Sequence, residues 1–103
     1  MQLTFVEHEN FTREMQGVLC DDDVLELMIR LLEHPEAGDV IPGSGGLRKI
    51  RVASSGRGKR GGARVIYFWF VDDQVIEFLS VYPKNRKSNL TADDLKKLRK
   101  LIE

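Results

Sequence analysis

The sequence predicts a single α+β domain with a mostly antiparallel sheet, helices packed on one side of it, and the element order β-α-α-β-β-β-α. Its 103 residues suit one domain. Three apolar and β-branched segments follow one another between residues 47 and 82, and only turn or loop residues separate them. Segments with apolar residues at three- and four-residue steps, typical of amphipathic helices, precede and follow them.

The first expected elements are a strand and a short helix. Leu3 and Phe5 belong to an alternating pattern that predicts a strand over residues 2–7. Asn10 is a suitable N-cap for a helix over residues 11–17, because its side chain can accept a hydrogen bond from a free backbone N–H group.

Asp21 or Asp22 is expected to be the N-cap of a second helix, with acidic residues in its first turn, and this helix is expected to end at His34 before Pro35. An apolar stripe at three- and four-residue steps predicts that one face of this helix packs against the core. The stripe consists of Val24, Leu25, Met28, Leu31 and Leu32.

A loop over residues 35–46, rich in glycine and proline, leads into the first of the three consecutive strands, over residues 47–54. Because successive side chains of a strand point to opposite faces, Lys49 and Arg51 are expected to share a face and Arg48 to lie on the other.

The second of these strands, over residues 63–71, is almost wholly apolar, which indicates burial on both faces. Asp72 and Asp73 are expected to form the turn to the third strand, over residues 75–82.

A final helix is expected over residues 92–102. Thr91 and Asp94 predict a variant of the capping box at its start. Its apolar face consists of Leu95, Leu98, Leu101 and Ile102.

The net charge of zero hides an asymmetry between the two parts of the chain. Residues 1–39 hold ten acidic and two basic residues, a net charge of −8, whereas residues 40–103 carry +8. This separation favours a cationic face for nucleic acid, unless the two parts neutralise each other inside the fold. Charge alone leaves both readings open.

Most of the candidate chemistry lies in residues 43–70, which contain seven basic residues, seven glycines and no acidic residue. Glycines let the backbone approach a ligand closely, and Arg and Lys bind phosphate. A polyanion is therefore the expected ligand. Tyr82 could add base stacking if its ring were exposed.

Other kinds of site find little support. Cys20 precedes three aspartates, which disfavour a thiolate, and neither His8 nor His34 is grouped with it, so neither a nucleophilic enzyme nor a metal site is expected. No apolar run approaches the roughly 18 residues of a membrane helix. One cysteine cannot form an intrachain disulfide, and a cytoplasmic protein without a cofactor is expected.

A cationic surface of this kind could either bind RNA or cleave it. RNA carries its own nucleophile, the 2′-hydroxyl, so a protein has to orient that group, take its proton and stabilise the charged phosphorane. A metal is not obligatory, and a lysine among clustered cations can act as the base. The residues permit both readings.

Two segments carry a family resemblance. Residues 38–70, GDVIPGSGGLRKIRVASSGRGKRGGARVIYFWF, and residues 79–90, LSVYPKNRKSNL, resemble the HigB-like branch of the RelE/ParE toxin superfamily, above all in the GGLRK and GKRGG motifs. The expected element order agrees with that fold over the whole chain. The resemblance implies one toxin domain, residues 1–103, with a RelE-like fold.

The resemblance also implies an activity and partners. Toxins of this kind belong to type II toxin–antitoxin pairs and cleave mRNA in the ribosomal A site, without metal, by attack of the 2′-hydroxyl. The implied partners are the ribosome, mRNA and a cognate antitoxin, often a helix-turn-helix protein similar to HigA. A non-catalytic RNA- or ribosome-binding module remains an alternative, as does a gyrase inhibitor, because ParE relatives share the fold.

By position in the motifs, the resemblance implies four catalytic residues. Lys49 is the candidate base and Arg51 the cation beside it, while Arg64 and Lys84 are expected to contact phosphate and stabilise transition-state charge. The expected RNA-binding residues are Arg48, Arg57, Lys59, Arg60, Tyr82 and Arg86. Many relatives carry a tyrosine or histidine near residues 87–90, where this chain reads KSNL.

Overall fold

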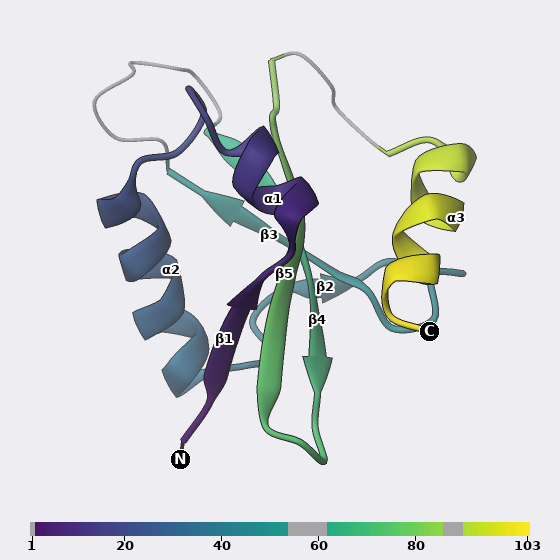
Figure 1. The fold of residues 1–103 in the computed structure, drawn as a ribbon, viewed down its shortest axis with the longest axis horizontal. Coiled ribbons are helices and arrows are strands. Elements are labelled where there is room, and N and C mark those ends of the chain that lie inside the picture. The colour runs from purple at the N-terminus through teal and green to yellow at the C-terminus, as the bar shows by residue number, and fades with distance from the viewer. Residues whose placement is uncertain (1, 54–61, 86–89) are drawn as a thin grey trace.

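The computed structural model describes residues 2–53, 62–85 and 90–103 and contains a five-stranded sheet and three helices (Figure 1). In chain order the elements are β1 (Thr4–Glu7), α1 (Glu9–Glu14), α2 (Asp21–Glu33), β2 (Asp39–Val40), β3 (Arg48–Val52), β4 (Ala63–Phe70), β5 (Val75–Pro83) and α3 (Ala92–Leu101). No helix in these three ranges is long and apolar enough to cross a membrane.

The sheet has the strand order β1-β5-β4-β3-β2. Only β1 runs parallel to its neighbour, β5, and the other three pairs are antiparallel. The predicted α+β class and the order of the predicted elements are confirmed. The strand β2 was missed, because its two residues lie in a segment whose glycines and prolines predict a loop.

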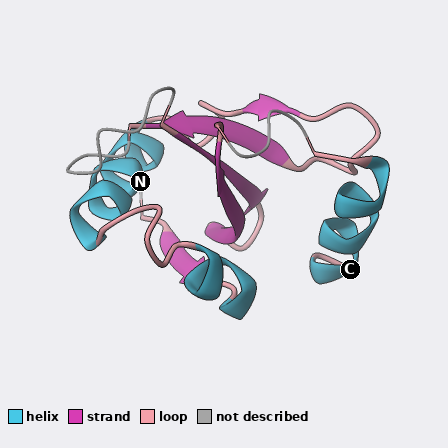
Figure 2. Cartoon of the chain, turned by 90° about the horizontal axis from the view of Figure 1, so that it is seen from above, coloured by secondary structure: helices cyan, strands magenta, loops and turns pink. Residues whose placement is uncertain are grey.

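Helices cover both faces of the sheet, so the expectation that all of them pack on one side is wrong for α3. Figure 2 shows α2 on one side of the sheet and α3 on the other. Phe11 of α1 packs in the same cluster as the buried residues of α2. Along β4, Val65 and Tyr67 pack with the residues of α1 and α2, whereas Ile66 packs with Leu98 of α3. The physical reason is the apolar run of β4, which needs burial on both faces. We call the two sides the α1/α2 face and the α3 face.

The helix starts were predicted less well than the helices themselves. α1 is capped by His8, whose Nδ1 accepts the backbone N–H of Asn10 at 3.0 Å, so the prediction of Asn10 as the cap is wrong. Cys20 rather than Asp21 or Asp22 is the N-cap of α2, and its N–H donates to the Asp23 carboxylate at 3.0 Å.

The start of α3 is as predicted. The Thr91 hydroxyl accepts the Asp94 N–H at 3.1 Å, and the Asp94 carboxylate accepts the Thr91 N–H at 3.0 Å. This capping box fixes the first turn of the helix.

A β-bulge in β5 sets which residues face α3. Ile66 pairs with Ser80 but Tyr67 pairs with Phe78, so Leu79 has no residue opposite it on β4. An extra residue reverses the alternation of side chains along a strand. As a result Phe78 lies on the α1/α2 face and Tyr82 on the α3 face, although four residues of regular strand would place them on the same face.

The buried Tyr67 anchors the segment between α2 and β2. Its hydroxyl accepts the Gly38 N–H at 2.9 Å and donates to the Pro35 carbonyl at 2.8 Å. Burial raises the pKa of this hydroxyl above its usual value, so it remains a donor at neutral pH. A Cβ on Gly38 would lie 2.8 Å from the Tyr67 ring, which explains the need for glycine there.

We expect Tyr67→Phe to lower the free energy of unfolding by about 1–3 kcal/mol, because it leaves a buried N–H and a buried carbonyl without a partner. Urea unfolding of the variant and the original protein measures this difference, provided that the free energy of unfolding falls with urea concentration at the same slope in both. A loss below about 0.5 kcal/mol would contradict the anchoring role, since even a single net hydrogen bond usually contributes that much.

Candidate functional site

Lys49, Arg51 and Arg64 share the α3 face, and the fourth candidate catalytic residue, Lys84, follows the end of β5 beside it. The register pairs Lys49 with Ile66 and Arg51 with Arg64, and Ile66 belongs to the α3 cluster. Lys49 and Arg51 therefore share the α3 face, as predicted. Lys84 follows β5 directly and is exposed, and its N–H donates to the Gly62 carbonyl at 3.2 Å, beside the start of β4.

Arg51, Arg64 and Tyr82 form one row across three neighbouring strands. Arg51 pairs with Arg64, and Arg64 pairs with Tyr82. Residues directly opposite each other in an antiparallel pair have Cβ atoms about 4.5–5.5 Å apart. Two arginines at that separation repel each other, so the free protein holds positive charge together where an anion would relieve the repulsion.

Arg64 is the most buried of these cations, with 9% of its surface exposed. It lies on the central strand β4, and its Nη1 donates to the Ala63 carbonyl at 3.3 Å. A guanidinium fixed on a central strand is better placed to recognise a phosphate than one on a free side chain, because less motion is lost on binding.

Tyr82 is 6% exposed, so its ring offers little surface on which a base could stack. The stacking role expected for it therefore finds no support. Burial raises the pKa of the Tyr82 hydroxyl, with a smaller lowering effect from Arg64 and a raising effect from Asp94. Tyr82 is thus neutral at physiological pH, and it packs in the same cluster as Leu98 of α3.

Arg48 lies on the opposite, α1/α2 face, as the alternation predicted, and this separates it from the other cations. Its Nη1 donates to the Gly38 carbonyl at 2.7 Å and the Glu36 carbonyl at 3.1 Å. Arg48 therefore holds the segment before β2, and its expected role in RNA binding stays a prediction.

Four further expected RNA-binding residues, Arg57, Lys59, Arg60 and Arg86, lie outside the described residues. The segments that hold them connect to described elements: one joins β3 to β4, and the other follows β5.

The close approach of β3 and β4 beside the first of these segments depends on Gly62. Its φ of +61° is a conformation that side chains disfavour, and a Cβ there would collide with the Val52 carbonyl.

The sequence did not reveal two acidic residues near the row of Arg51, Arg64 and Tyr82, which we call the cationic row. Asp39 on β2 lies opposite Lys49 in the register, and Asp94 of α3 acts on Tyr82. The positions of Asp39 and Asp94 beside these residues depend on contacts distant in sequence. The only local signal was the Thr91–Asp94 capping pattern, which predicts the start of a helix but not that Asp94 lies near Tyr82.

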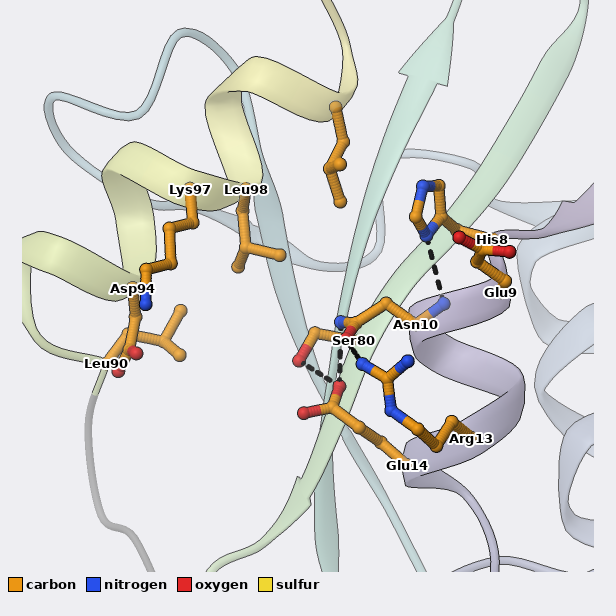
Figure 3. Close-up of a pocket in the computed structure, with 11 residues that line it drawn as sticks. His8, Glu9, Asn10, Arg13, Glu14, Ser80, Leu90, Asp94, Lys97 and Leu98 are labelled. Atoms are coloured by element: carbon orange, nitrogen blue, oxygen red, sulfur yellow. Dashed lines mark hydrogen bonds between the residues drawn. The ribbon is translucent and has the colours of Figure 1, made fainter.

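The best-formed pocket in the described part of the chain, about 320 Å³, lies between α1 and α3 beside β5 (Figure 3). It contains none of the four candidate catalytic residues. On its α1 side the Glu14 carboxylate accepts hydrogen bonds from Asn10 Nδ2 at 3.0 Å, Ser80 Oγ at 2.7 Å and the Val81 N–H at 3.3 Å. Asn10 Nδ2 also donates to the Leu79 carbonyl at 2.9 Å. These bonds attach α1 to the edge of β5.

Within residues 2–53, 62–85 and 90–103, no group of three or more His, Cys, Asp or Glu side chains is arranged to hold a metal ion. The described candidate residues on or beside the α3 face are two arginines, two lysines and the neutral Tyr82.

Comparison with known proteins gives a consistent result. A family model described as the RelE toxin of the RelE/RelB toxin–antitoxin system matches residues 5–103. The fold is similar to that of a mutant of the E. coli toxin RelE in the free state, with a TM-score of 0.66, 19% identity and coverage of 94% of this chain and 97% of that one.

Two complexes contain similar chains. The intact E. coli RelBE toxin–antitoxin complex gives a TM-score of 0.58 and 22% identity, and covers 78% of this chain and 94% of that one. The archaeal RelE–RelB complex from Pyrococcus horikoshii OT3 gives a TM-score of 0.55 and 28% identity, and covers 84% of this chain and 99% of that one.

The pairing of two arginines leads to a prediction about stability. We expect Arg51→Ala to raise the free energy of unfolding at low ionic strength by about 0.2–1 kcal/mol, because like charges directly opposite each other destabilise a strand pair. Chemical unfolding at low and high salt tests this, since the gain should shrink as salt screens the repulsion. A loss of stability at low salt would show that the two arginines do not repel each other in the free protein.

Proposed function

Because this chain belongs to the RelE toxin family, whose model matches residues 5–103, we propose that it is a ribosome-dependent endoribonuclease that cleaves mRNA in the ribosomal A site and so inhibits translation. The single observation that carries this proposal is the placement of Lys49, Arg51, Arg64 and Lys84 on or beside the α3 face.

The proposed reaction uses the nucleophile that RNA supplies. The 2′-hydroxyl loses its proton to a base and attacks the adjacent phosphorus, which breaks the bond to the 5′-oxygen. The leaving 5′-oxygen takes a proton from water, so a 2′,3′-cyclic phosphate and a free 5′-hydroxyl result. Negative charge grows on the phosphorane oxygens in the transition state. Arg64 is the proposed contact to those oxygens, because its guanidinium is fixed, planar and always protonated.

The flanking cations have separate proposed roles. Arg51 lies on one side of Arg64, on β3, and Lys84 follows β5 on the other side. The exposed Lys84 is proposed to contact the phosphate from there. Lys49 removes the proton of the 2′-hydroxyl, and Arg51, two residues further along the same face, adds positive charge. Lys59 and Arg60, in the basic segment between β3 and β4, are proposed to contact the anionic surface of ribosomal RNA.

The proposed partner is a cognate antitoxin. The two complexes with which the chain shares its fold are RelE toxins assembled with RelB antitoxins. The GGLRK and GKRGG motifs support the finer proposal that this is a HigB-like toxin with a helix-turn-helix antitoxin similar to HigA. The proposed site of action, the translating ribosome, is in the cytoplasm.

We expect Arg64→Ala to lower the rate of mRNA cleavage on programmed ribosomes at least 100-fold, and to abolish growth arrest, because the fixed charge on the phosphorane is lost. Circular dichroism establishes that the variant is folded. Arg13→Ala, which removes an exposed arginine of α1, is the matched control and should cleave like the original protein.

The same assay separates the alternatives. Ribosome binding by the original protein without a cleaved 3′ fragment would indicate a binding module. DNA breaks with undisturbed translation would indicate a gyrase inhibitor. Full activity of the folded Arg64→Ala variant would remove Arg64 from the site.

Lys49→Arg tests the proposed base. The substitution keeps the positive charge, but a guanidinium stays protonated and cannot take a proton at neutral pH. We expect cleavage to fall at least 100-fold while ribosome affinity changes less than threefold. Arg51→Lys should retain most of the activity, because only its charge is used. Equal activity of Lys49→Arg and the original protein would make Lys49 a phosphate contact and not the base.

A further inference from the structure

The helix α2 exposes a second apolar stripe on the side away from the core. Leu25, Ile29 and Leu32 are 53%, 52% and 41% exposed, and they follow one another at steps of four and three residues. At 100° per residue these three side chains fall within about one sixth of a turn. The same helix buries Val24, Leu27 and Leu31 against the sheet. A helix that is apolar on two sides is typical of one covered by other elements on both.

The stripe continues into a hollow at its C-terminal end. Leu32 lines a pocket of about 540 Å³ together with Leu3 and Thr4, at the start of β1, and with Asp73 and Gln74 of the β4–β5 turn. The stripe therefore ends beside this pocket. Leu25 to Leu32 spans about 10 Å along the helix axis, which matches two turns of a second helix laid beside it.

The charge beside this stripe is acidic. Asp22, Glu26 and Glu33 are exposed and lie along one edge of the stripe, within about one third of a turn of it. The only basic residue of α2, Arg30, is directed elsewhere, because its Nη1 donates to the Arg51 carbonyl at 3.1 Å. A partner with Lys or Arg beside an apolar row would complement this surface.

We propose that this stripe of α2 binds an amphipathic helix of the antitoxin. Apolar side chains of that helix pack against Leu25, Ile29 and Leu32, and its basic side chains pair with Asp22, Glu26 and Glu33. This rests on the proposed function, which supplies the antitoxin as the partner.

A second copy of this chain fits the stripe less well. Two α2 helices packed about a twofold axis would bring the acidic edges of both copies together. The repulsion would oppose such a dimer, whereas a basic helix gains from the same charges.

The location separates antitoxin binding from catalysis. α2 lies on the α1/α2 face, and the cationic row lies on the α3 face (Figure 2). Substitutions in the stripe should therefore weaken the complex and leave cleavage by the free toxin unchanged.

The experiment uses the purified full chain and, as the probe, the purified product of the reading frame adjacent to its gene. We expect Ile29→Glu to lower antitoxin affinity at least 100-fold, measured by calorimetry, while cleavage on programmed ribosomes stays within twofold of the original protein. The double charge reversal Glu26→Lys with Glu33→Lys should lower affinity at least 10-fold and reduce its dependence on salt. Exposed positions keep both variants folded, which thermal unfolding checks.

Val40→Glu is the matched control, because it places the same charge on a 52% exposed apolar residue of β2, which lies away from α2 in both overall views (Figures 1 and 2). Three results would each overturn the proposal. Ile29→Glu could bind the antitoxin as tightly as the original protein, or Ile29→Glu and Val40→Glu could lose the same amount of antitoxin affinity. The original protein could also form a dimer that Ile29→Glu dissociates. If the original protein did not cleave mRNA, the proposed function would be contradicted. If the original protein did not bind the antitoxin, both the proposed partner and this binding site would be contradicted.

Discussion

The strand β4 must be buried on both faces, and much of the architecture follows from that requirement. Its side chains alternate between two clusters, with Val65 and Tyr67 in one and Ile66 in the other. Each cluster needs a cover, so α1 and α2 close one face and α3 the other. The same strand carries Arg64 at its start, which places the central cation of the candidate site on the best-supported strand of the sheet.

The sequence was informative where a local pattern matched a local structure. Apolar periodicity located every element except β2, and strand alternation placed Lys49 and Arg51 on one face and Arg48 on the other. It was uninformative where a distant contact decided the outcome. The bulge at Leu79, which turns Tyr82 toward α3, leaves no mark in the alternation of apolar residues, and the hydrogen bonds of Arg48 join it to a segment ten or more residues earlier.

The asymmetry of charge along the chain becomes a division in space. Acidic residues of the first part gather on α2, and the candidate catalytic cations lie on or beside the α3 face. The two readings that charge alone left open were nucleic-acid binding and internal neutralisation. Asp39 opposite Lys49 is the point in the sheet register where the two sets meet. The acidic residues of α2 and the cations of the α3 face otherwise lie on different elements, which favours two charged surfaces.

The bonds between Glu14 and β5 have a consequence for self-association. β1 pairs with β5 only as far as Phe78, so the next residues would present unpaired backbone groups along an open edge. Asn10 and Glu14 occupy the Leu79 carbonyl and the Val81 N–H instead. A strand from another molecule could not extend the sheet there without first displacing α1. A short helix thus protects this half of the edge against the intermolecular pairing that leads to aggregation.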